Sequence, residues 1–255
     1  MITCPSCGNR QESGNFCESC GHAMLDQSSQ IEGNPSFEKM KRLSKSFFQY
    51  AIERFKKPNL VFLDDEQDFP NALIAFFLLP FLIATFIYAI LNQIYRIEFS
   101  GYALNQTRLP YFNLTSRLFI IFLLLLVCGY FANLLIMKIT NHPISNKQLF
   151  SKYFGLQVPF LFIFAGLMLL SLLGIISINP FRPEDSLWLL ILVTIVVVIM
   201  MVINPIIIAF HQLSLQRNHQ SYYFTSLSFL INLLFMYIIT KLLYESFINE
   251  LINMF

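Results

Sequence analysis

The sequence predicts an all-α polytopic membrane domain of about five transmembrane helices, with a small cysteine-rich β module at the N-terminus. Three observations predict it: five long uncharged apolar runs, a composition that is 56% hydrophobic and only 13% charged, and four of the five cysteines within the first 20 residues. Soluble domains carry roughly a quarter charged residues. The composition therefore excludes an ordinary soluble fold, and the formal net charge of +2 gives no electrostatic reason to expect nucleic acid as a partner.

The N-terminal cysteines form two CxxCG motifs, CPSCG at 4–8 and CESCG at 17–21. Two residues between cysteines let both sulfurs of a tight turn face one ion, and the following glycine lets the backbone bend toward them. Four thiolates complete a tetrahedron with no open position, so we expect one structural Zn²⁺. The expected ligands are Cys4, Cys7, Cys17 and Cys20.

Disulfides are the main alternative for dense cysteines, and an iron site is another. No apolar stretch follows Met1, which argues against a secretory signal peptide and favours reduced thiolates. A module of about 25 residues is too small to bury a core, so zinc would supply its folding free energy, on the order of 10 kcal/mol. His22 is surplus to four sulfurs and is expected at the surface.

The segment FCESCGHA at 16–23, together with CPSCG at 4–8, resembles the bacterial zinc-ribbon family, in which such ribbons precede membrane domains. The resemblance covers residues 1–25 and implies a small β zinc ribbon. It also implies that the ribbon is structural or binds a protein partner.

A polar linker is expected at 26–35, followed by an amphipathic basic helix at 36–57 that we call the arm. Ser36 can cap its start and Pro58 ends it. Its charged face holds seven basic and two acidic side chains, which favours binding to anionic lipids in the membrane surface. The open alternative is that its apolar stripe packs on the protein's own spans. The stripe contains Phe37, Met40, Leu43, Phe47, Phe48, Ala51, Ile52 and Phe55.

The membrane domain is expected at 70–255, because five apolar runs there reach or approach the roughly 20 residues needed to cross a bilayer as a helix. The runs are Ala72–Leu91, Leu118–Met137, Val158–Ile178, Leu187–Phe210 and Tyr222–Thr240.

Orientation depends mainly on the arm. Counted over the arm and the connections, eleven basic residues fall on the N-terminal side of the membrane and five on the other. The connections alone show no such bias. The positive-inside rule then places the N-terminus in the cytoplasm of a bacterium and the C-terminus outside.

The stretch ITNHPISNKQLFSKYFGLQVP at 139–159 is similar to the hydrophilic link before the third span of the Yip family of five-span proteins. That resemblance, which concerns layout, implies a role in membrane organisation or trafficking. The Asp-Leu-Tyr-Gly-Pro motif of the eukaryotic members is absent here, so a Rab-type GTPase partner is not implied.

Few polar residues interrupt the runs, and no charged residue lies near the middle of one, which argues against an ion-coupled transporter. Asn204-Pro205 and Asn232 are expected to make interhelical hydrogen bonds or a kink, and framing a pocket is the alternative. Cys128 is expected to be a packing residue. His142, His211 and His219 fall on the same predicted side, where either solvated loop residues or a second metal site would fit.

No catalytic motif is present, so we expect no enzyme activity. The function expected first is a membrane scaffold whose cytosolic ribbon docks a protein partner. The alternatives are a sensor or regulator driven from the ribbon, and a small-molecule permease or its accessory subunit.

Overall fold

The computed structural model describes residues 2–3, 7, 9–12, 18–20, 35–98, 108–176, 178, 187–215 and 220–254. Within the whole chain, Met1–Lys45 and Ser46–Phe255 form two compact units. Each unit is described by itself below.

The first unit contains a short antiparallel hairpin. Strand β1 (Ile2–Thr3) pairs with β2 (Arg10–Gln11), with Ile2 opposite Gln11 and Thr3 opposite Arg10. The Gln11 side chain is buried and its Oε1 accepts a hydrogen bond from the Glu18 backbone N–H at 3.0 Å. This bond ties the hairpin to the turn at Glu18–Cys20.

The boundary between the two units falls within helix α1 (Pro35–Lys56), which is followed by two 3₁₀ turns, η2 (Pro58–Leu63) and η3 (Glu66–Asp68). Pro58 starts η2, where its missing N–H costs nothing. Asp65 caps η3 by accepting from the Gln67 N–H at 2.7 Å, and the Asp68 carboxylate accepts from the Asp65 N–H. The capping box turns the chain into the first long apolar helix.

The described chain contains four helices long and apolar enough to cross a membrane. The first two are α2 (Phe69–Glu98) and α3 (Tyr111–Ile139). The third consists of α6 (Leu187–Val198), a π-helical turn η5 (Ile199–Ile203) and α7 (Asn204–Leu215). The fourth lies within α8 (Ser221–Met254). The prediction of a mostly helical protein with several membrane-length apolar helices is confirmed.

The run expected at Val158–Ile178 is not one straight span. Helix α5 (Val158–Leu172) has 15 residues, about 22 Å, and ends early because Gly174 adopts φ 73°. Before it lies α4 (Asn146–Gly155), bent from α5 by 41°. The pair can be one broken span, which makes a fifth crossing, or a re-entrant element.

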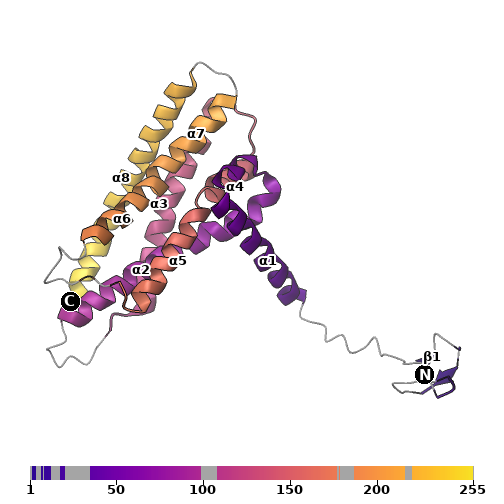
Figure 1. The fold of residues 1–255 in the computed structure, drawn as a ribbon. Helices are drawn as coiled ribbons and strands as arrows, with labels where there is room; N and C mark the ends of the chain where they lie inside the picture. Colours follow the sequence, from indigo (N-terminus) through magenta and orange to yellow (C-terminus); the bar gives the residue numbers. More distant parts are fainter. Residues whose placement is uncertain are drawn as a thin grey trace. The chain divides into compact units, whose positions relative to one another are not determined.

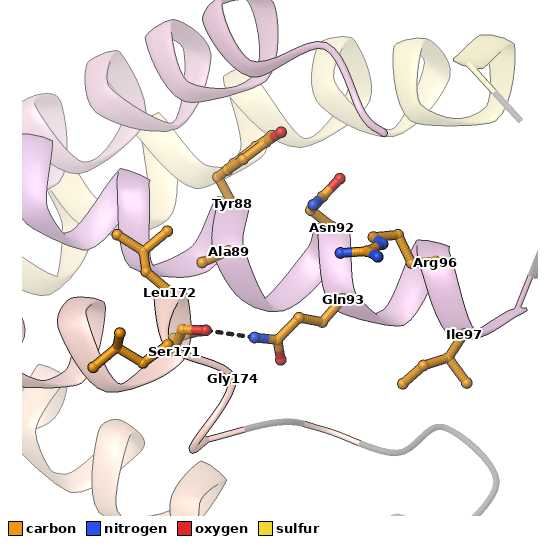
Figure 2. Close-up of a pocket in the computed structure, with 10 residues that line it drawn as sticks. Tyr88, Ala89, Asn92, Gln93, Arg96, Ile97, Ser171, Leu172 and Gly174 are labelled. Carbon is orange, nitrogen blue, oxygen red and sulfur yellow. Dashed lines mark hydrogen bonds between the residues drawn. The ribbon is translucent and has the colours of Figure 1, made fainter. Parts of the chain in front are cut away.

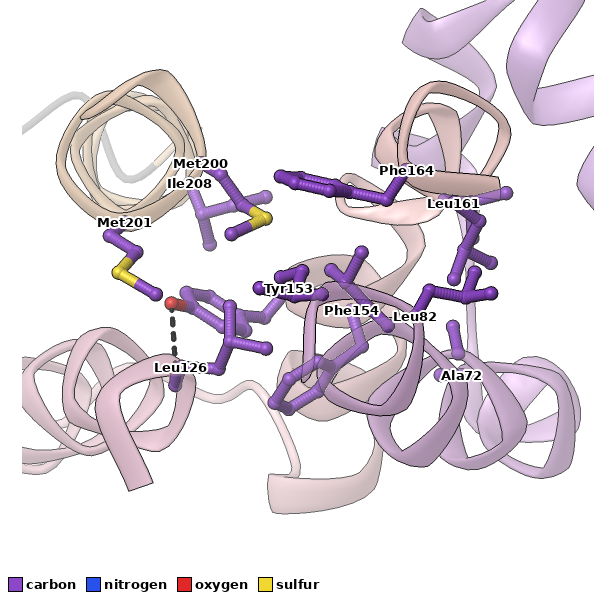
Figure 3. Packing of buried hydrophobic residues seen from close by; sticks show 14 of the residues in the cluster. Ala72, Leu82, Leu126, Tyr153, Phe154, Leu161, Phe164, Met200, Met201 and Ile208 are labelled. Carbon is purple, nitrogen blue, oxygen red and sulfur yellow. Dashed lines mark hydrogen bonds between the residues drawn. The ribbon is translucent and has the colours of Figure 1, made fainter. Parts of the chain in front are cut away.

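The long helices of the second unit lie side by side (Figure 1), and α2 packs on both α3 and α5 while α8 packs on α3 and α7. Their shared core includes Tyr153 and Phe154 of α4, both 1% exposed (Figure 3). Phe154 packs against Phe76 of α2 with ring centroids 4.8 Å apart. Helix α4 is therefore held by aromatic contacts inside the helical domain.

Candidate functional site

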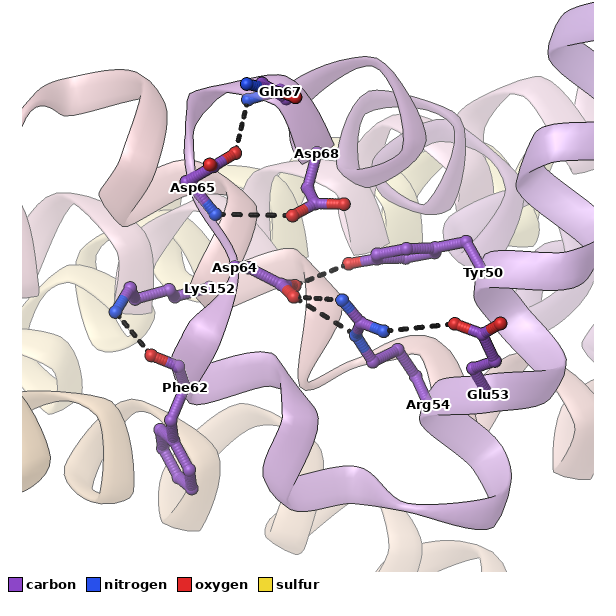
Figure 4. A network of polar contacts seen from close by, with 9 residues as sticks. All are labelled: Tyr50, Glu53, Arg54, Phe62, Asp64, Asp65, Gln67, Asp68 and Lys152. Atoms are coloured by element: carbon purple, nitrogen blue, oxygen red, sulfur yellow. Dashed lines mark hydrogen bonds and ion pairs between the residues drawn. The ribbon is translucent and has the colours of Figure 1, made fainter.

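A buried ion pair fixes the C-terminal part of α1 to the chain that follows it (Figure 4). Arg54 Nε donates to Asp64 Oδ1 at 3.1 Å, and Nη2 donates to the same oxygen. The Tyr50 hydroxyl donates to Asp64 Oδ2 at 2.7 Å. Since Asp64 is 1% exposed, its carboxylate depends on these partners rather than on water.

Gly155 completes this group of contacts, which we call the arm lock (Tyr50, Arg54, Asp64 and Gly155). A β-carbon at position 155 would lie 2.6 Å from Asp64 Oδ2 and 2.6 Å from the Tyr50 hydroxyl. It would also lie 2.5 Å from Val61 Cγ2. The end of α4 therefore closes over the ion pair, and only a residue without a side chain fits there.

The electrostatics of the arm lock follow from burial. Burial raises the pKa of Asp64, against the hydrogen bonds from Arg54 and Tyr50 that lower it. For Arg54, burial lowers the pKa, but the bond and charge of Asp64 outweigh it and the net direction is upward. Burial also raises the pKa of Tyr50, which keeps the phenol a donor. Because a guanidinium stays protonated in proteins, Arg54 keeps a positive charge beside the Asp64 carboxyl group.

A second set of contacts joins η2 to the ends of α4 and α7. Lys152 Nζ donates to the Phe62 carbonyl at 2.6 Å, and the Phe62 ring stacks on His211 with centroids 4.1 Å apart. His142 Nε2 lies 3.0 Å from the Gln212 carbonyl, while its Nδ1 accepts from the Ile144 N–H at 3.2 Å. The segment between α1 and α2 is thus fastened to one end of the helical domain.

A buried polar cluster surrounds Pro205, where the π-helical turn η5 meets α7. Proline has no N–H, so carbonyls one turn earlier in the helix lose their usual partner. The Met201 carbonyl, four residues before Pro205, accepts instead from Asn232 Nδ2 at 2.9 Å. The Met200 carbonyl accepts from Gln157 Nε2 at 3.0 Å, and Gln157 Oε1 accepts from Asn204 Nδ2 at 3.2 Å.

Helix α3 contributes the other side of this cluster. Asn133 Nδ2 donates to the Pro205 carbonyl at 3.1 Å, and Asn133 Oδ1 accepts from the Ser228 hydroxyl at 2.7 Å. A β-carbon at Gly129 would lie 2.6 Å from Pro205 Cγ and would also meet the Tyr153 hydroxyl. The sequence prediction that Asn204-Pro205 and Asn232 serve interhelical hydrogen bonding is confirmed. The roles of Gln157, Asn133 and Ser228 were not predicted, and only for Gln157 did the sequence offer a signal, Pro159 two residues later.

The same few residues of α4 and its bend touch both assemblies. Gly155 closes the arm lock, and Gln157, two residues later, bonds the η5 carbonyl. Tyr153, also in α4, ties this helix to α3, because its hydroxyl donates to the Leu126 carbonyl at 3.1 Å (Figure 3). A shift of α4 would therefore change contacts in both the arm lock and the Pro205 cluster.

Arg54 is one of the seven basic residues that the sequence predicts on the charged face of the arm, but the structure buries it. Arg54 is 9% exposed because it reaches Asp64, and Tyr50 and Ala51 are buried beside it. Phe48 and Phe55 of the expected apolar stripe are instead 62% and 51% exposed. Phe55 also contacts Phe162 of α5, with ring centroids 4.7 Å apart. From Ser46 onward, α1 therefore packs on the helical domain by a face that includes a charge.

Of the predicted zinc ligands, Cys4 and Cys17 lie outside the described residues, while Cys7 and Cys20 are exposed. Within the described part of the chain, no three His, Cys, Asp or Glu side chains are grouped to hold a metal. Strands β1 and β2 pair with each other and lie on either side of residues 4–7 in the sequence. The Gln11–Glu18 hydrogen bond joins β2 to residue 18.

The remaining predicted residues are placed as follows. Cys128 is buried in α3, 2% exposed, in agreement with a packing role. His142 and His211 have the contacts given above and are not grouped with other metal ligands in the described chain. His219 lies outside the described residues.

No protein-family model and no solved structure matches the chain. The chain is similar to a protein of Bacillus subtilis (strain 168) described as the uncharacterized protein YvbI, at 27% identity over 161 residues. The match covers 62% of this chain and 63% of that protein, so the chain spans less than two thirds of the relative's length.

Proposed function

We propose that the chain is a non-enzymatic scaffold of the bacterial cytoplasmic membrane, with a cytosolic zinc ribbon as its docking module. The membrane part crosses five times, with α4 and α5 acting as one bent span. Exposed aromatic residues near helix ends support placing these helices across the membrane, because tyrosine and tryptophan favour the membrane–water interface. They are Trp188 at the start of α6 and Tyr222 and Tyr223 at the start of α8.

The orientation proposed has the N-terminus in the cytoplasm and the C-terminus outside. Its support is the basic arm, of which Lys56 and Lys57 are exposed. Exposed Phe48, Phe55 and Leu63 lie close to them in the sequence. Apolar rings beside ammonium groups suit the headgroup region of an anionic leaflet, which supports anionic lipids as partners of this segment.

The ribbon is proposed to hold one Zn²⁺ through Cys4, Cys7, Cys17 and Cys20. Two features support it: the β1–β2 hairpin flanks the first CxxC motif, and the Gln11–Glu18 hydrogen bond joins that hairpin to a residue of the second motif. Bound zinc would supply the folding free energy of the ribbon. Since four thiolates leave the metal no open coordination position, the ribbon would act through its surface, by binding a protein partner.

The observation that carries the scaffold proposal is the arm lock. A docking module on a freely jointed tether needs no fixed base, yet α1 ends in a buried Arg54–Asp64 pair closed by Gly155. Fixing residues 46–57 in advance lowers the conformational entropy that this part of the arm would lose when a partner binds. The resemblance of 139–159 to the Yip family supports a role in organising the membrane.

The test is crosslinking in native membranes, followed by purification of the full chain. Wild type, Cys17→Ser and Gly155→Ala are compared, with Gly166→Ala as a control because a β-carbon there meets nothing within 4 Å. The scaffold proposal expects one reproducible set of crosslinked proteins, lost with Cys17→Ser and weakened with Gly155→Ala. An identical set from wild type and Cys17→Ser would contradict docking through the ribbon.

A second candidate is a sensor or regulator, and the double role of α4 favours it. Movement of the arm would reach the Pro205 cluster through Gly155 and Gln157. Hydrogen exchange of the whole protein with and without a zinc chelator separates the two functions. Faster exchange in η5 and α7 after chelation supports a sensor, whereas a change confined to the ribbon supports a scaffold.

A further inference from the structure

A cavity of about 600 Å³ lies between the C-terminal ends of α2 and α5 (Figure 2). This is the opposite end of the helical domain from the arm lock, because α2 and α5 both begin beside the arm lock and run away from it. Its size is within the range of small-molecule sites. It belongs to neither assembly described above.

Two buried polar atoms at this cavity lack a hydrogen-bond partner within the described structure. Gln93 Nε2 donates to the Ser171 carbonyl at 2.6 Å, which leaves Gln93 Oε1 unused, and the Ser171 hydroxyl is also unused. Ser171 is 1% exposed. Leaving such groups unpaired costs about 1–3 kcal/mol each, so both are poised to bond a ligand.

Arg96 gives the cavity its charge. Its exposed side chain folds back along α2 toward Asn92 and Gln93 (Figure 2), and no acidic side chain is among the described lining residues. Two other polar groups of the lining are already engaged by the chain before α3. Tyr88 donates to the Leu109 carbonyl at 3.0 Å, and Asn92 Oδ1 accepts from the Leu109 N–H at 3.0 Å.

The other walls are apolar, formed by Ala89, Ile97, Leu172 and Leu173. A guanidinium and a hydroxyl suit the oxygens of a phosphate, while the unused Gln93 oxygen suits a hydroxyl donor. The apolar walls suit the start of an acyl chain.

We infer that this cavity binds an anionic phosphate ester that also carries a free hydroxyl, supplied by an amphiphile such as phosphatidylglycerol. Arg96 and Ser171 hold the phosphate, and Gln93 accepts from the hydroxyl of the headgroup. The site does not depend on the zinc ribbon.

The experiment measures lipid binding to the purified full chain by native mass spectrometry in an uncharged detergent. The probes are phosphatidylglycerol, phosphatidylcholine and soluble glycerol 3-phosphate. We expect phosphatidylglycerol to bind at least about tenfold more tightly than phosphatidylcholine. Arg96→Gln should remove about tenfold of that affinity, and Ser171→Ala a few-fold. Lys241→Gln, which removes a positive charge from exposed α8 outside the cavity, should change nothing.

Equal affinity of wild type and Arg96→Gln for phosphatidylglycerol would overturn the inference, as would equal binding of the two lipids. Tighter binding of glycerol 3-phosphate than of phosphatidylglycerol would keep the phosphate site and reject a lipid as its source. Arg96→Lys guards against a folding defect, because it keeps the charge and should bind between wild type and Arg96→Gln.

Discussion

Gly155 lies so close to Asp64 that a β-carbon on the glycine would be 2.6 Å from the carboxylate oxygen Oδ2. The same oxygen accepts the Tyr50 hydroxyl at 2.7 Å, so the space is already filled by a hydrogen bond. This contact joins the end of α4 to the arm, and it makes position 155 the most sensitive point of the arm lock.

Gly155→Ala should destabilise the docking of residues 46–68 by about 1–3 kcal/mol, the usual range for overpacking. Hydrogen exchange of the intact protein should show faster exchange in that segment. Gly166→Ala is the matched control, since its β-carbon meets nothing within 4 Å. Equal protection of 46–68 in the two variants would show that α4 does not hold the arm.

Arg54→Met should cost about 3–5 kcal/mol, because it leaves the Asp64 carboxylate buried without its charge partner. Adding Asp64→Asn should recover part of that loss. A double-mutant cycle on thermal or denaturant unfolding measures the coupling, and additive effects would mean that the pair contributes nothing specific.

The pH dependence of Arg54→Met has a definite sign. Burial already raises the pKa of Asp64 above 3.8 in the wild type, and without Arg54 that pKa should rise further. A raised folded-state pKa means that the native state binds the proton more readily, so stability increases as the pH falls through that pKa. The variant should be less destabilised at about pH 5 than at about pH 8. A larger deficit at the lower pH would contradict a buried, unpaired carboxylate.

Asn232→Leu should cost about 0.6–1.7 kcal/mol, since it leaves the Met201 carbonyl without a donor inside the bundle. Pro205→Ala restores a backbone N–H beside that carbonyl, so the double variant should lose less than the sum of the two single variants. Ser226→Leu, at an exposed position of α8, controls for the added apolar side chain. Strict additivity would show that Asn232 does not compensate for the proline.

Hydropathy predicted the long helices because a bilayer-length run of apolar residues leaves the backbone few alternatives to a helix. The bend between α4 and α5 was harder to predict. Polar Gln157 there lies between apolar residues, and its role depends on η5, which is more than forty residues later in the sequence. The one local signal for the bend is Pro159, which lies in the first turn of α5.

The arm lock could not be predicted from the periodicity of the sequence, for a different reason. Asp64 lies in an acidic stretch with Asp65, Glu66 and Asp68, yet among these four Asp64 alone is buried. Nothing local distinguishes it, because its partner Arg54 is ten residues away across the turn at Pro58. A charge pattern can show that a pair is possible, whereas burial of one particular pair depends on the tertiary packing of α4.

The proposal of a cytosolic zinc ribbon is tested most directly by thiol labelling in cells. The cells express the full chain with Cys128→Ala, which removes the buried cysteine of α3. A membrane-impermeant maleimide is applied to intact cells, to permeabilised cells, and to permeabilised cells with a zinc chelator. A cytosolic zinc ribbon predicts that Cys4, Cys7, Cys17 and Cys20 react fully only in the third condition. Labelling in intact cells would contradict the cytosolic placement, and full labelling after permeabilisation without chelator would contradict the zinc site.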